Sequence, residues 1–175
     1  MAGLSEYVNE VKDNKEQSQI TYGVNIDWIS GMKTSATVQN ITLGDQKLVR
    51  GFNFTIDEPN QLLGLNSHPT PQEYLMAGLA GCMAVTFVAG ATLLGITLES
   101  LTVKISGSID LCGFLGINND ETIGFKEFNC CFVVSGDGTK EQYELLKKRV
   151  KKHSPNFASV YKGVNIITTL TQKRI

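Results

Sequence analysis

Hydrophobic and polar positions in the first third of the chain follow first a helical and then a strand period. Residues 4–16 carry Leu4, Val8 and Val11 at helical spacing. Apolar and polar residues then alternate through 19–29, 34–43 and 47–57, with Gly-containing turns between these stretches. The pattern predicts a short amphipathic helix followed by a meander of three antiparallel strands.

The longest apolar run, residues 74–94, contains no charged side chain. Thr70 and Pro71 form a helix-start signal, Glu73 completes a capping box, and Gly95 ends the run. The run is long enough to span a bilayer, but Ala, Gly, Thr and Met make up most of it and no Lys or Arg flanks it. We therefore interpret it as a helix buried on all sides in a protein core, and we expect no membrane partner.

In the second half of the chain, segments with the strand period are followed by segments with the helical period and then by a further strand-like segment. Strands are predicted at 96–110, 124–135 and 164–171, a loop at 111–123, an amphipathic helix at 139–153 and a further helix opening at Ser154-Pro155. Tyr143, Leu146 and Val150 are the positions of the amphipathic helix expected to face the core. The order predicts an α+β fold in a single domain over residues 1–175, with residues 1–18 as an N-terminal helical extension.

Composition narrows the function classes. Sixteen basic and seventeen acidic residues leave a net charge of −1 over 175 residues, which argues against a nucleic-acid partner. Four cysteines and two histidines without zinc spacing predict no metal, and no resident cofactor is expected. The first residues lack the apolar segment of a signal peptide, and cysteines are few, so we expect a reduced, cytoplasmic protein.

Cys82, beside Gly81 in the central apolar run, is the leading chemical candidate. A buried free cysteine can act simply as a small hydrophobe. A reactive thiolate here would need a cation from elsewhere, because Cys82 lies more than two turns from the start of its own helix. Glu73 lies nine residues earlier, about 13 Å along a straight helix, so it either only caps the helix or meets Cys82 of a second subunit.

The basic stretch 147–153 is interpreted as a solvated helix face near a helix C-terminus, where positive charge is favourable, and a weak anion or nucleic-acid contact is the alternative.

Several segments together resemble one known family. They are Asp57-Glu58-Pro59, Leu63-Gly64, residues 70–75, 77–82, 95–99, 110–116 and 154–157. In order and spacing, from about residue 25 to 172, they are similar to the OsmC/Ohr family of osmotically inducible and organic hydroperoxide resistance proteins.

The resemblance implies an OsmC-like fold in which antiparallel sheets of two intertwined subunits wrap around paired central helices. It also implies a homodimer whose interface holds a thiolate that attacks an organic hydroperoxide, and Cys82 matches that thiolate. A second cysteine would resolve the resulting sulfenic acid, and an external dithiol would complete the cycle. Glu73 corresponds to the family's acid but lies one place later than in the hydroperoxide resistance branch, and Lys33 or Arg50 would supply the cation that an arginine gives in the family.

This chain departs from the family pattern at the resolving cysteine. Ser154 occupies that place, in the stretch His153-Ser154-Pro155, and serine cannot resolve a sulfenic acid. Cys112, on the loop 111–123, is the alternative resolver. The hairpin position of the family's arginine holds Met32-Lys33, and Lys33 lacks the bidentate fork of arginine.

Two functions from different classes follow. The first is a thiol-dependent hydroperoxide reductase that uses Cys82. The second is a non-catalytic binding module that holds a small apolar ligand in an interface pocket around Cys82. The residues expected to line that pocket are Gly78, Leu79, Val85, Thr86, Phe87 and Ser154. A purely structural dimer with an inert Cys82 is the third reading.

Overall fold

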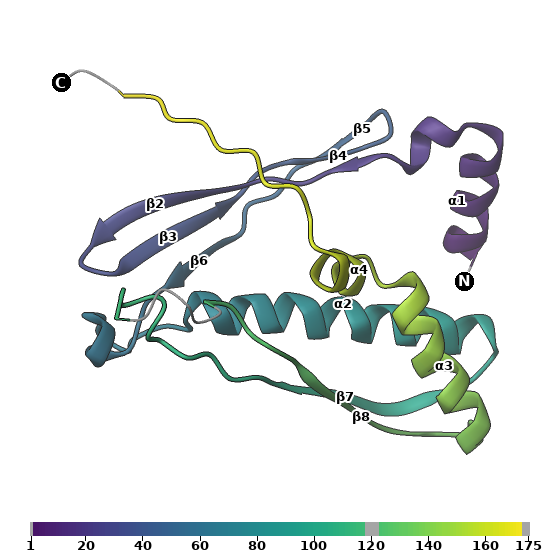
Figure 1. Ribbon diagram of the computed structural model, residues 1–175. Helices are drawn as coiled ribbons and strands as arrows, with labels where there is room; N and C mark the ends of the chain where they lie inside the picture. The colour runs from purple at the N-terminus through teal and green to yellow at the C-terminus, as the bar shows by residue number, and fades with distance from the viewer. Residues whose placement is uncertain (1, 118–122, 173–175) are drawn as a thin grey trace. The chain divides into compact units, whose positions relative to one another are not determined.

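A computed structural model describes residues 2–117 and 123–172 of the chain (Figure 1). The chain forms two compact units, Met1–Leu75 and Met76–Ile175, and each is described by itself.

The first unit begins with helix α1 and continues as strands. Its elements are α1 (Ala2–Asp13), η1 (Lys15–Ser18), β1 (Ile20–Thr21), β2 (Val24–Ser30), β3 (Lys33–Val38), β4 (Ile41–Leu43), β5 (Gln46–Leu48), β6 (Asn53–Ile56) and η2 (Asn60–Leu62). The strands form two antiparallel sheets, in the orders β1-β4-β5 and β2-β3-β6. The predicted antiparallel meander is confirmed, and the long β2–β3 hairpin is visible in Figure 1.

Each of the three predicted strands is broken into two. The side chains of Gln39 and Asn40, which follow β3, take hydrogen bonds of their own at the break. Asn40 Oδ1 accepts from the Arg50 backbone N–H at 2.8 Å, and Gln39 Nε2 donates to Asn25 Oδ1 at 2.6 Å. The Asn40 side chain thus takes a backbone N–H that a continuous strand ladder would pair with a backbone carbonyl. The unbroken strands expected at 19–29, 34–43 and 47–57 were therefore too long.

A buried carboxylate organises the loop after β6. Asp57 has no exposed surface and accepts hydrogen bonds from the backbone N–H groups of Glu58, Leu65 and Ser67, at 2.9–3.2 Å, and from Ser67 Oγ at 2.7 Å. These donors, led by Ser67, hold the pKa of Asp57 well below its ordinary value. The loop is thus fixed around one negative charge.

The central helix α2 (Pro71–Leu93) has the predicted ends. Thr70 N–H donates to Glu73 Oε2 at 2.7 Å, and Glu73 N–H donates to Thr70 Oγ1 at 3.3 Å, which is a capping box. Gly95 adopts φ +69°, and the N–H groups of Gly95 and Ile96 donate to the carbonyls of Thr92 and Ala91, at 3.2 and 2.9 Å. This Schellman geometry requires a left-handed residue, which explains the glycine.

The second unit packs a two-stranded sheet and two helices against one side of α2. Its other elements are β7 (Leu98–Ser106), β8 (Asn129–Gly136), α3 (Lys140–His153) and α4 (Pro155–Lys162). Leu79, Met83, Phe87 and Ala91 of α2 form the core with Leu146 and Val150 of α3. Phe87 also stacks on Phe132 of β8, with ring centroids 5.4 Å apart, and Figure 1 shows α2 lying along the β7–β8 hairpin. The predicted inward positions Leu146 and Val150 are confirmed.

Only one side of α2 is buried within the described chain. Val85, Leu93 and Val88 are 71%, 61% and 44% exposed. Among the described residues, α2 is the one helix long and apolar enough to cross a membrane, a test that core helices of soluble proteins also pass.

Two other expectations need correction. The strand predicted at 164–171 is absent: that segment is exposed and has no strand partner among the described residues. A strand without a neighbouring strand has no partners for its backbone N–H and C=O groups. The prediction of a strand at 164–171 was therefore wrong for the single chain. The strand predicted from 124 begins only at Asn129. Residues 118–122 of the predicted loop 111–123 lie outside the described residues.

Candidate thiol site

Cys82 lies midway along α2, half-buried, next to the helix face that forms the core of the second unit. Its backbone carbonyl accepts a second hydrogen bond, from Thr86 Oγ1 at 2.9 Å. The position of the Cys82 backbone is therefore fixed by hydrogen bonds within α2. The surroundings of its sulfur are set by the element that packs against α2.

The Cys82 sulfur contacts the first turn of α4. Ser154 Oγ lies 3.2 Å from Cys82 Sγ, with the geometry of an O–H donor, and the Asn156 backbone N–H donates to the same sulfur at 3.5 Å. Ser154 is 1% exposed and is the N-cap of α4, and its Oγ also accepts from Phe157 N–H at 3.4 Å. Two hydrogen-bond donors at the start of α4 are therefore directed at the Cys82 sulfur.

Asn156 fixes α4 on α2. Its side-chain Nδ2 donates to the carbonyl of Gly78 at 2.9 Å, one turn before Cys82. Its backbone and side chain thus hold both the sulfur and the helix that carries it. Sequence reasoning missed Asn156, although the Ser154-Pro155 start signal predicted a helix whose first N–H groups need partners.

Glu73, Lys33 and Arg50 belong to the first unit, whereas Cys82 belongs to the second. Glu73 is engaged in the capping box of α2. Lys33 begins β3 and is half-buried. Arg50 is exposed between β5 and β6, with its guanidinium carbon 4.5 Å from the centre of the Phe52 ring. The contacts that the structure gives to the Cys82 sulfur come from Ser154 and Asn156.

The expected pocket residues of α2 spread over several sides of the helix. Leu79 and Phe87 are buried in the core, at 4% and 1% exposure. Val85 is 71% exposed, and Thr86 bonds to the Cys82 carbonyl. The predicted ligand pocket involves a second chain and stays a prediction.

Cys112 lies in the turn that follows Asp110. Its backbone N–H donates to Asp110 Oδ1 at 2.8 Å, and this bond is the main cause of the lowered pKa of Asp110. No disulfide joins the cysteines within the described residues, and burial raises the pKa of Cys130. In the part of the chain that the structure describes, no group of three His, Cys, Asp or Glu side chains could hold a metal ion.

The described residues thus form an α+β chain in which a cysteine of the central helix contacts the N-terminus of another helix. The family model described as OsmC-like protein matches residues 64–169, more than half of the chain. The chain belongs to this OsmC-like family.

Solved structures share the fold. An OsmC-like protein from Mycoplasma pneumoniae is 21% identical, with a TM-score of 0.63 over 82% of this chain and 89% of that one. An OsmC-like protein of unknown function from Vibrio cholerae is 13% identical, with a TM-score of 0.63 over 79% and 92%. An organic hydroperoxide resistance protein from Elizabethkingia anophelis is 19% identical, with a TM-score of 0.53 over 82% and 89%. No curated protein matches the sequence.

Proposed function

We propose that this chain is a thiol-dependent reductase of organic hydroperoxides, with Cys82 as the peroxide-reacting thiol. The observation that carries the proposal is the position of Cys82 Sγ at the N-terminus of α4, 3.2 Å from Ser154 Oγ and 3.5 Å from the Asn156 backbone nitrogen. Organic hydroperoxide resistance proteins of similar fold support the choice of substrate class.

In the first step the Cys82 thiolate attacks the terminal oxygen of a hydroperoxide ROOH. A sulfur–oxygen bond forms and the O–O bond breaks, and the leaving alkoxide takes up a proton to become the alcohol ROH. The sulfur is oxidised to a sulfenic acid and the peroxide is reduced. The Ser154 hydroxyl and the Asn156 N–H stabilise the attacking thiolate by donating hydrogen bonds to it.

The second half of the cycle returns the sulfenic acid to a thiol. Ser154 has no thiol to offer, so an external dithiol forms a mixed disulfide with Cys82 and releases water. The second thiol of the dithiol then attacks that disulfide and frees Cys82. Cys112 is the candidate internal resolver, in which case a Cys82–Cys112 disulfide forms first and the dithiol reduces it.

The reactive form is a cytoplasmic homodimer, in which the exposed side of α2 packs against a second copy of the chain. The apolar character of that side, with Val85 71% and Val88 44% exposed, supports this assembly. Glu73, with Lys33 or Arg50, then acts at the thiol across the dimer interface, which accounts for an acid too far along α2 to reach Cys82 of its own chain.

Turnover with a dithiol tests the proposal. Cumene hydroperoxide consumption is measured with reduced lipoamide for the intact protein, for Cys82→Ser and for the control Cys131→Ser, which removes an exposed thiol on β8. We expect Cys82→Ser to lose all protein-dependent consumption and Cys131→Ser to retain it. Equal consumption by the intact protein and Cys82→Ser contradicts the proposal.

A gain-of-function variant tests the geometry of the same site. Ser154→Cys places a thiol where an oxygen now lies 3.2 Å from Cys82 Sγ. After one equivalent of cumene hydroperoxide, we expect this variant to lose two hydrogens in a disulfide between positions 82 and 154. A variant that stays fully reduced contradicts the assignment of Cys82 as the reacting thiol.

A further inference from the structure

A pocket in the second unit lies between the C-terminal half of α2 and α3, away from the thiol site. Its volume is about 300 Å³, at the lower end of the ~300–1,000 Å³ range of small-molecule sites. Leu93 of α2, Leu94 just after its end, and Leu145 and Leu146 of α3 form its apolar part. Gly90, the first α2 residue that lines it, lies eight residues beyond Cys82, about 12 Å along the helix axis.

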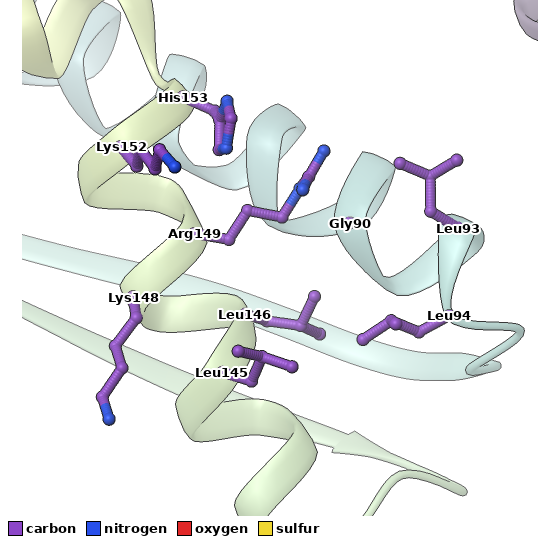
Figure 2. A pocket seen from close by; sticks show the side chains of 9 residues that line it. All are labelled: Gly90, Leu93, Leu94, Leu145, Leu146, Lys148, Arg149, Lys152 and His153. Carbon is purple, nitrogen blue, oxygen red and sulfur yellow. The ribbon is translucent and has the colours of Figure 1, made fainter.

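Gly90 sets how closely α3 approaches α2 in this pocket. A Cβ at Gly90 would lie 2.7 Å from Leu146 Cδ2, closer than real Cβ atoms pack, and 3.1 Å from Arg149 Cδ, which is a tight contact. The missing side chain therefore lets the Arg149 stem lie against α2. Figure 2 shows Arg149 extending from α3 toward α2 above Gly90, while Leu146 and Leu94 point toward each other below it.

The polar part of the pocket is basic. Arg149, Lys152 and His153 line it beside the leucines, and the lining includes no Asp or Glu. Within the described residues, the ion pair formed by α3 joins Lys147 to Glu144, at 2.7 Å, and involves neither Arg149 nor Lys152. Lys152 and His153 lie in the last turn of α3, where positive charge also offsets the helix dipole, but Arg149 lies earlier and reaches across to α2.

We propose that this pocket binds a monocarboxylate with a medium-length alkyl chain. The planar guanidinium of Arg149 matches the two oxygens of a carboxylate, and Lys152 adds a second positive charge beside it. The alkyl chain covers the leucines and removes their surface from water. A small inorganic anion leaves the leucines uncovered, and an uncharged alkane leaves the guanidinium without its partner.

The test is calorimetric titration of the full-length protein with sodium decanoate, below its micelle concentration. We expect saturable binding of one decanoate per chain. We expect Arg149→Gln to weaken it by about tenfold or more, the effect of losing a charge-assisted hydrogen bond. Lys151→Gln is the matched control, because it removes the same charge from an exposed position of α3 that does not line the pocket, and it is expected to stay within about twofold.

Further probes separate this site from the others. Decan-1-ol is expected to bind at least about tenfold more weakly than decanoate, and Cys82→Ser is expected to bind decanoate as the intact protein does. The proposal is overturned if no decanoate binds, which is the result expected when a second copy of the chain fills the pocket. It is equally overturned if Arg149→Gln and Lys151→Gln weaken decanoate binding to the same extent. Two further results would overturn it. One is that decanoate shields Cys82 from alkylation, which would place the ligand at the thiol site. The other is that Arg149→Gln weakens association with phosphatidylglycerol vesicles but leaves decanoate binding unchanged.

Discussion

At the scale of single residues, Ser154 has two structural tasks. Its Oγ lies 3.2 Å from Cys82 Sγ as a hydrogen-bond donor, and the same oxygen accepts from Phe157 N–H as the N-cap of α4. From the sequence, Ser154 was expected to start a helix, to replace the missing cysteine and to line the interface pocket, but not to donate to the thiol. The structure shows it as part of the immediate surroundings of the thiol.

Ser154→Ala therefore affects both stability and reactivity. Loss of the N-cap lowers the free energy of unfolding by about 1 kcal/mol. Loss of the donor slows alkylation of Cys82 by iodoacetamide about two- to tenfold at neutral pH, the effect of one hydrogen bond of ~0.5–1.5 kcal/mol. Urea denaturation and peptide-resolved alkylation rates measure the two effects.

Thr139→Ala is the matched control for Ser154→Ala. Thr139 is the N-cap of α3, with its side chain accepting from Gln142 N–H, and it has no hydrogen bond with Cys82 among those of the described residues. It is expected to lose similar stability while Cys82 keeps its reactivity. Equal slowing of alkylation in both variants would show that the effect comes from general loosening, and not from the Ser154 hydroxyl.

At the scale of elements, the loop that follows β6 depends on the charge of Asp57. Its carboxylate is buried and accepts from Glu58, Leu65 and Ser67, and the pKa is held below the ordinary 3.8. A lowered pKa in the folded state means that ionised Asp57 stabilises folding. This contribution is complete above the unfolded-state pKa, near 4, and is lost as the pH falls toward the folded-state value.

Asp57→Asn should remove part of the acid sensitivity of the fold. We expect the free energy of unfolding of the intact protein to fall between pH 5 and pH 3, and the variant to be less stable at pH 7 but to change less over the same range. Urea denaturation at several pH values measures both curves. An unchanged pH dependence in Asp57→Asn would show that other carboxyl groups govern acid unfolding.

Local signals predicted the helices well and the strands less well. The cap at Thr70, the glycine at Gly95 and the Ser154-Pro155 start each act through neighbouring backbone groups, so the sequence reveals them directly. The breaks in the first three strands depend on which groups the Asn40 and Gln39 side chains reach, the Arg50 N–H and the Asn25 side chain, and alternation of apolar residues does not contain that information. The segment 164–171 has strand-like composition but lacks a partner strand in the described chain.

The candidate site was predictable only in part. Cys82 was found because its place in the apolar run matched a known family pattern. The donors at its sulfur come from residues 154 and 156, more than seventy positions later, and their proximity depends on how α4 packs on α2. The dipole of α2 itself does not reach Cys82, whereas α4 provides the helix N-terminus that the sequence argument lacked.

At the scale of the whole molecule, we expect a homodimer in which a second copy of the chain covers the exposed side of α2. A charge buried in such an interface without a partner is unfavourable. Val85→Glu is therefore expected to raise the dissociation constant of the dimer by at least about tenfold, measured by light scattering after size-exclusion chromatography.

Val133→Glu is the matched control for the assembly. Val133 is 48% exposed on β8, and the α2 side chain Phe87 packs instead on the neighbouring residue Phe132. This variant is expected to remain dimeric. A monomeric intact protein, or equal dissociation of both variants, would contradict an interface at α2.

The central claim is that Cys82 is a peroxide-reactive thiol, and the intact mass of the reduced full-length protein after one equivalent of cumene hydroperoxide tests it most directly. With peptide mapping and dimedone trapping, we expect oxidation at Cys82, either as one added oxygen or as a two-hydrogen loss that links it to Cys112. An unmodified Cys82, with the peroxide intact or the oxygen on another residue, would contradict the claim.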